Sequence, residues 1–188
     1  MEIILGSASP RRKELLKQMG FDFSVLISDV EEIYDPATPP ENVASVLAKL
    51  KAQSLKNKLT PGQLLICCDT TVILNNEVLG KPKSKNEATE TLKRLSGKRH
   101  EVISAVYMIY GDKTIEFKDS TSIEFKTLNE GEIDFYVAEY QPFDKAGSYG
   151  IQEWIGHIGI FKIEGSYTNV MGLPTQLLYK EIQKLKSV

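Results

Sequence analysis

The sequence predicts an α/β protein built on a mixed sheet. Residues 64–74 form an almost unbroken apolar, β-branched run, which is typical of a central strand buried on both faces. Two strand-like stretches, 100–110 and 113–125, flank Gly111-Asp112 in the manner of an antiparallel hairpin. Segments with helical spacing lie between the strands, so both parallel and antiparallel pairs are expected. A chain of 188 residues is long enough to bury a proper core.

The N-terminal quarter predicts two strands and two helices. A strand at residues 2–6 precedes a helix at 10–19, which Gly20 ends from its C′ position. Residues 21–28 read as a second strand, and an acidic, proline-rich loop follows it. A long helix then begins at Pro40. Its apolar face is expected at helical spacing on Val43, Leu47, Leu50 and Leu55.

Two further helices carry capping pairs. Ser84 and Glu87 have the spacing of a capping box and open a helix that stops at Gly97. Asn129 with Glu132 caps another short helix.

The last quarter is less regular. Residues 147–165 are rich in glycine and β-branched residues, and a final helix is expected to begin near Pro174. No internal repeat or low-complexity segment interrupts the chain. A length of 188 residues suits one large domain or two small lobes, and we expect a single domain with two lobes spanning residues 1–188.

Composition excludes several classes of partner. A net charge of −2 argues against broad electrostatic binding to nucleic acid or to a membrane surface. No run approaches the ~18 apolar residues of a membrane span, and the N-terminus lacks the apolar region of a signal peptide. Cys67 and Cys68 are adjacent, which suits buried reduced thiols better than a disulfide. These features predict a cytoplasmic protein.

The stretch SASPRR at residues 7–12 breaks a local rule. Ser9 occupies the N-cap position of a helix and Pro10 its first turn, where a proline does no harm. Arg11 and Arg12 follow at the positive end of the helix dipole, where carboxylates are usual. Either the arginines reach outward into solvent, or they form an anion cradle together with the free N–H groups of the helix start.

Asp69 and Lys81 are two further polar residues in unusual places. Asp69 interrupts the buried strand, and Thr70 and Thr71 extend the polar break. Lys81 lies between glycine and proline in a short loop. A structural aspartate and a solvated lysine are the alternatives. Together with the arginines, these residues suit metal-assisted chemistry on a polyphosphate.

Other phosphate and nucleophile motifs are missing from the sequence. It contains neither G-x-x-x-x-G-K-[ST] nor G-x-G-x-x-G, which argues against a P-loop or a dinucleotide site. His100 and His157 lie far apart, with no partnered serine or cysteine signature.

The chain resembles the Maf-like nucleoside triphosphate pyrophosphatases in a series of blocks that occur in family order from residue 3 to about 178. The blocks are SASPRR, the Glu-containing loop at 29–32, LAKLKA (47–52), CDTTVIL followed by LGKP, LKRLSGKRHEV, DKAGSYGIQ (144–152) and IEGSYTNVMGLP (163–174).

The resemblance implies an elongated α/β fold with a mixed twisted sheet and two lobes around a central cleft. It further implies a homodimer that hydrolyses a nucleoside triphosphate to the monophosphate and pyrophosphate with a divalent cation, Mg²⁺ or Mn²⁺. The role proposed for the family is removal of non-standard or excess nucleotides, and the family was first linked to septum formation.

Carried over residue by residue, the resemblance assigns the catalytic carboxylate to Asp69, as general base or metal ligand. The second metal-side carboxylate falls on Glu32, although Glu31 competes for it because this chain has VEE where relatives often have a V/I-D-E pattern. The position before the catalytic aspartate, often alanine or serine, is Cys68 here. The phosphate site falls on Ser7, Arg11, Arg12, Lys51 and Lys81.

Three positions predict which nucleobase the substrate carries. The family branch that acts on dTTP and UTP pairs an arginine, a threonine and a glutamine, matched here by Arg12, Thr70 and Gln152. Uracil and thymine present N3–H as a donor and O4 as an acceptor, and one glutamine amide can answer both. A 7-methyl-GTP pyrophosphatase of the same fold and a nucleotide-binding regulator of cell division remain the alternatives. The first of these tends to have glutamate in place of the late glutamine.

Overall fold

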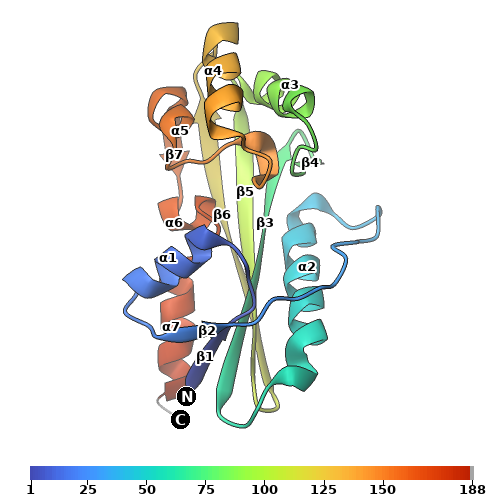
Figure 1. Cartoon of the computed structure of the whole chain (residues 1–188), viewed down its shortest axis with the longest axis vertical. Helices are drawn as coiled ribbons and strands as arrows, with labels where there is room; N and C mark the ends of the chain where they lie inside the picture. Colours follow the sequence, from blue (N-terminus) through green and yellow to red (C-terminus); the bar gives the residue numbers. More distant parts are fainter. Residues whose placement is uncertain (187–188) are drawn as a thin grey trace. The chain divides into compact units, whose positions relative to one another are not determined.

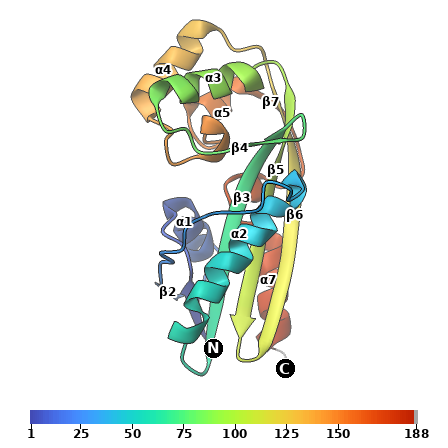
Figure 2. The ribbon, with the colours of Figure 1, turned by 90° about the vertical axis from the view of Figure 1, so that its right-hand side faces the viewer.

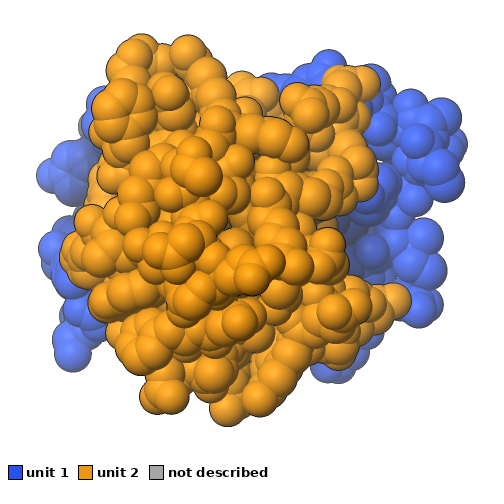
Figure 3. Space-filling view, turned by 90° about the horizontal axis from the view of Figure 1, so that it is seen from above, with its two compact units in different colours: residues 1–69, 104–119, 172–188 blue, residues 70–103, 120–171 orange. Residues whose placement is uncertain are grey.

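The structure is a computed structural model that describes residues 1–186 of the chain. The chain folds into two compact units (Figure 3). The first unit is formed by Met1–Asp69, Ser104–Asp119 and Gly172–Val188, and the second by Thr70–Ile103 and Ser120–Met171. Each unit therefore combines segments that are far apart in the sequence.

The elements follow one another as a mixture of helices and strands (Figures 1 and 2). The strands are β1 (Glu2–Leu5), β2 (Phe23–Val25), β3 (Gln63–Leu74), β4 (Glu77–Leu79), β5 (Arg99–Tyr110), β6 (Lys113–Phe125) and β7 (Ile160–Glu164). The α-helices are α1 (Pro10–Gln18), α2 (Pro40–Leu55), α3 (Lys85–Leu95), α4 (Glu130–Tyr140), α5 (Trp154–Gly159), α6 (Tyr167–Val170) and α7 (Thr175–Lys186). Two short 3₁₀ turns complete the fold, η1 (Lys56–Lys58) and η2 (Ala146–Ser148).

Within the described residues the strands form one seven-stranded sheet in the order β2-β1-β3-β5-β6-β7, with β4 paired to β3. The strand β1 runs parallel to both of its neighbours, placing Leu5 opposite Ile66 of β3 and Val25 of β2. By contrast, β4 is antiparallel to β3, and β7 is antiparallel to β6. The sheet is therefore mixed and flanked by helices, which confirms the predicted fold class.

Local sequence signals are borne out at three helix starts. Ser9, Ser84 and Asn129 each cap the helix that follows by accepting a hydrogen bond from a backbone N–H. Gly20 lies just beyond α1 with a φ of 79°, a left-handed conformation that glycine adopts easily.

The predicted strand at residues 21–28 was too long, because β2 covers only Phe23–Val25. Among the residues that the structure describes, its sheet partner is β1, which ends at Leu5, so the pairing cannot extend further. After one more hydrogen bond, from Leu26 N–H to the Leu5 carbonyl, the chain leaves the sheet.

Two predictions about apolar stretches have different outcomes. The run in β3 is buried without a break from Leu64 to Asp69, as expected for a central strand. On α2, Leu50 is only half-buried, and the buried face also includes three alanines. Cys67 and Cys68 are buried and unpaired, as predicted.

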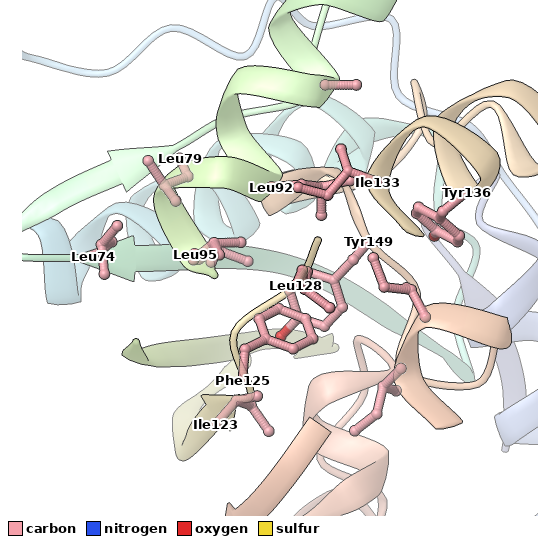
Figure 4. Packing of buried hydrophobic residues seen from close by; sticks show 14 of the residues in the cluster. Leu74, Leu79, Leu92, Leu95, Ile123, Phe125, Leu128, Ile133, Tyr136 and Tyr149 are labelled. Atoms are coloured by element: carbon pink, nitrogen blue, oxygen red, sulfur yellow. The ribbon is translucent and has the colours of Figure 1, made fainter. Parts of the chain in front are cut away.

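Each unit has its own apolar interior. In the first unit, Gly6 follows β1 at a point where a Cβ would lie 2.3 Å from Cys67 Sγ, so only glycine fits between the strands. In the second unit, side chains from α3, α4 and the strands pack around Phe125, Tyr136 and Tyr149 (Figure 4). No helix among the described residues is long and apolar enough to cross a membrane.

His100 is buried within the aromatic part of this second core. Its ring lies 5.4 Å from that of Phe125 and 5.5 Å from that of Tyr149, centroid to centroid. Its Nε2 shares a hydrogen bond of 2.8 Å with the Tyr149 hydroxyl. Burial lowers the pKa of His100 to about 4, so the imidazole is neutral in the fold at pH 7.

We expect the stability of the protein to fall as the pH drops from 6.5 to about 4. In this window the unfolded chain binds a proton at His100 that the fold excludes, which costs up to about 3 kcal/mol of unfolding free energy. Urea denaturation at a series of pH values measures it. His100→Gln removes this part of the pH dependence, whereas His157→Gln, at an exposed histidine, leaves it in place. Identical pH slopes for His100→Gln and the unmodified protein would contradict the assignment.

Candidate active site

The first part of the site is the turn between β1 and α1. The backbone N–H of Gly6 bonds to the Ile66 carbonyl at 2.8 Å, which keeps the turn against β3. Ser7 follows, and its Oγ accepts the N–H of Ser9 at 3.2 Å. The predicted strand, tight turn and capped helix start are therefore all present, and they place Ser7 at the carboxyl end of a parallel strand. In α/β sheets, this end commonly carries functional residues.

The guanidinium of Arg12 is held by two oxygens of the protein. Its Nε donates to the Gly172 carbonyl at 2.8 Å, and its Nη1 donates to Ser7 Oγ at 3.2 Å. The thiol of Cys68 donates to the same Gly172 carbonyl at 3.1 Å. Arg12 thus has a fixed orientation before any ligand binds, rather than reaching outward into solvent.

A lysine and two carboxylates form the second part of the site. Lys51 projects from α2, and its Nζ forms ion pairs with Asp69 of β3 and, at 3.0 Å, with Glu32. The side chains of Lys51 and Asp69 are only 12% and 10% exposed, whereas that of Glu32 is 42% exposed. Glu32 lies in the irregular loop between β2 and α2. Of the two residues that compete for the second metal-side position, Glu32 forms this ion pair with Lys51.

Lys51 is positively charged over the whole physiological pH range. Burial alone would lower its pKa, but attraction to Asp69 and Glu32 outweighs burial and raises the pKa above its ordinary value. The ammonium therefore balances the two carboxylates, whose like charges would otherwise repel each other.

The carboxylates of this group provide some of the oxygen ligands that a hard divalent cation prefers. Asp69 and Glu32 supply carboxylate oxygens that already converge on one positive charge, the Lys51 ammonium. Within residues 1–186, no cluster of three or more His, Cys, Asp or Glu side chains could hold a metal by itself. A Mg²⁺ ion usually takes one or two carboxylates and completes its shell with water and substrate phosphates. Two carboxylates therefore supply part of the shell, and water and substrate phosphates would supply the rest.

Three more predicted residues belong to the second unit. Thr70 directly follows Asp69 in β3 and is half-buried. Lys81 is exposed in the loop after β4, and Gln152 is exposed in the turn before α5. A backbone hydrogen bond joins the segments next to these two residues. The N–H of Gly147, five residues before Gln152, donates at 3.2 Å to the carbonyl of Gly80, which directly precedes Lys81.

The predicted site residues thus fall into two groups. The first unit brings together Ser7 and Arg12, and separately Glu32, Lys51 and Asp69. Arg11 lies half-buried in the first turn of α1. The second unit contains Thr70, Lys81 and Gln152.

Sequence reasoning missed the Gly172 carbonyl and the buried ion pair of Lys145 with Glu153. A backbone carbonyl leaves no signal in a sequence. Lys145 could have been noticed as a charge inside the block DKAGSYGIQ.

Comparison with known proteins places the chain among relatives over almost its full length. The profile of the family described as Maf-like protein matches residues 2–185. The dTTP/UTP pyrophosphatase of Bacteroides thetaiotaomicron is 45% identical over 185 residues, which cover 98% of this chain and 96% of the relative. The dTTP/UTP pyrophosphatase of Flavobacterium psychrophilum is 47% identical, with 95% of this chain and 91% of the relative covered.

Among solved structures, the Staphylococcus aureus Ham1 protein matches with a TM-score of 0.45 and 22% identity, covering 66% of this chain and 72% of that one. The sequence relatives decide the classification, because they are 45% and 47% identical to this chain over 98% and 95% of its length. This chain belongs to the Maf family.

Proposed function

We propose that the protein hydrolyses dTTP and UTP to the monophosphate and pyrophosphate. The observation that carries the proposal is the buried ion pair between Asp69 and Lys51, joined by Glu32. A carboxylate held beside a permanent positive charge supports the role of Asp69 as general base. The names of relatives at 45–47% identity support the substrate class.

The chemistry requires a water molecule to attack the α-phosphorus while pyrophosphate leaves. Asp69 takes the proton of this water, because its carboxylate is held in place and partly shielded from solvent. Lys51 keeps that carboxylate oriented and offsets charge that develops on the phosphoryl oxygens. Arg11, Arg12 and Lys81 bind the triphosphate, and Ser7 orients the guanidinium of Arg12.

A divalent cation, Mg²⁺ or Mn²⁺, would be held by Asp69 and Glu32 together with the substrate phosphates. When bound, it would supply Lewis-acid polarisation of the phosphate and lower the pKa of a bound water.

Base selection is assigned to Arg12, Thr70 and Gln152. An amide presents both a donor and an acceptor, which matches the N3–H and O4 of uracil and thymine. A glutamate at position 152 would only accept hydrogen bonds and would suit a guanine edge or a methylated cationic base better. We further infer a homodimer in the cytoplasm. The two buried thiols of Cys67 and Cys68 suit a reducing compartment.

A turnover panel of dTTP, UTP, CTP, dUTP, GTP and 7-methyl-GTP with Mg²⁺ tests the proposed function. We expect dTTP and UTP to have the highest kcat/KM, measured by release of pyrophosphate. Preferred hydrolysis of 7-methyl-GTP would refute the assignment of Gln152. Tight binding without turnover of any nucleotide would instead favour a nucleotide-binding regulator.

Asp69→Asn should lower kcat for dTTP by about 10²–10⁴-fold, because asparagine keeps the shape of the side chain but cannot accept the proton of water. Circular dichroism and thermal melting check that the fold is retained. Asp112→Asn, in the exposed turn between β5 and β6, is the matched control and should leave kcat unchanged. Near-normal turnover by Asp69→Asn would remove Asp69 from the role of general base.

Substitutions of the two arginines should have different effects. Arg11→Gln removes a phosphate-binding charge and should raise KM for all nucleotides to a similar extent, by about 10-fold. Arg12→Gln loses the anchored guanidinium and should also change the ranking of the bases. Steady-state kinetics with UTP, CTP and GTP separates the two. Equal effects of both substitutions on every substrate would disprove this division of roles.

A further inference from the structure

Gln152 is exposed, but the main chain that carries it is tightly constrained. It lies in the turn between η2 and α5, where the N–H of Glu153 bonds to the Gly150 carbonyl at 3.0 Å. A Cβ on Gly150 would lie 2.7 Å from Cδ of Glu153, and one on Gly156 would lie 1.9 Å from the carbonyl oxygen of Ile151. Glycine at both positions lets the turn close against the start of α5.

The hydroxyl of Tyr136, on α4, binds this turn on both sides of Gln152. It accepts the N–H of Gly150 at 2.9 Å and donates to the carboxylate of Glu153. The rest of the tyrosine is packed in the core of the second unit, where the residue is fully buried (Figure 4). One oxygen anchored in the core therefore fixes the residue two before Gln152 and the residue directly after it.

The charge of Glu153 is balanced by Lys145. The Nζ of this lysine lies 3.0 Å from Glu153 Oε1 and 2.7 Å from Asp144 Oδ1, and its side chain is only 9% exposed. Burial raises the pKa of Tyr136, and the neighbouring Glu153 raises it further, so the hydroxyl keeps its proton and remains a donor. Tyr136, Glu153 and Lys145 thus form a connected series of polar contacts, in which the two contacts to the Glu153 carboxylate are charge-assisted.

We propose that Tyr136, acting through Gly150 and Glu153, is a positioning residue that sets the base selectivity of Gln152. The proposal rests on the proposed function, in which Gln152 reads the pyrimidine. Tyr136 makes no contact with the nucleotide in this scheme. Its effect is exerted through the position of the turn.

Selectivity depends on this position for a chemical reason. Cytosine presents an acceptor at N3 and a donor at N4, the reverse of uracil. A glutamine amide could match either base if it were free to rotate by about 180° and exchange the positions of its oxygen and nitrogen. A fixed backbone at Gln152 limits the positions from which the amide can reach the base, and this is what Tyr136 contributes to discrimination between UTP and CTP.

Tyr136→Phe tests the proposal with full-length protein, because it deletes the hydroxyl and keeps the ring. We expect the ratio of kcat/KM for UTP to that for CTP to fall about tenfold, mainly through KM for UTP. Tyr149→Phe is the matched control. It removes another buried hydroxyl from the same core, one that bonds to His100 rather than to the turn. It should lower the melting temperature without changing the ratio.

Gln152→Ala separates failure of this proposal from failure of the proposed function. If Gln152→Ala lowers the ratio and Tyr136→Phe does not, Tyr136 is structural and the proposal is wrong. If both tyrosine variants lower the ratio equally, general loosening of the core explains the result and the proposal is again wrong. If Gln152→Ala leaves the ratio unchanged, the assignment of Gln152 in the proposed function is wrong, and the role of Tyr136 falls with it.

Glu153→Gln is the second test if Tyr136→Phe fails to fold. It breaks the ion pair with Lys145 and is expected to lower the ratio of kcat/KM for UTP to that for CTP. An unchanged ratio would overturn the proposal.

Discussion

The candidate site depends on one buried positive charge, the ammonium of Lys51. Asp69 and Glu32 come from different parts of the chain, and their like charges would repel each other if nothing lay between them. The helix α2 resolves this conflict. Its buried alanines, Ala44 and Ala48, leave room for close packing, and Lys51 projects from the same helix toward both carboxylates. The geometry available for catalysis is therefore set by the packing of one helix.

The sequence predicted those parts of the fold that depend on local chemistry. Caps such as Ser9 and Asn129 act within one helical turn, and the buried run of β3 is apolar enough to be recognised without knowledge of its neighbours. The length of β2 could not be predicted in the same way, because it depends on where its partner β1 ends. The short elements α5 and β7 were missed for a related reason, since tertiary packing rather than propensity decides such brief segments.

Site residues could be identified by type, but their mutual contacts could not. Asp69 could be identified as a polar break in a buried strand, whereas Lys51 came only from the family resemblance. The two residues are 18 positions apart in sequence and form an ion pair in the structure. The bond from Arg12 to Gly172 joins residues that are 160 positions apart and involves a backbone atom. No pattern of residue types encodes such a contact, which arises only when the C-terminal segment folds back beside α1.

Gly172 has a consequence for how this protein tolerates genetic change. Its φ of 108° excludes most side chains, so replacements at this position are expected to be rejected on conformational grounds. The acceptor that orients Arg12 is a carbonyl, which every residue possesses, and it is therefore hidden from any scan that exchanges side chains. The thiol of Cys68 donates to the same carbonyl, but an exchange of Cys68 would leave the carbonyl itself in place as the acceptor for Arg12. The contact that orients Arg12 is thereby inherited through backbone shape.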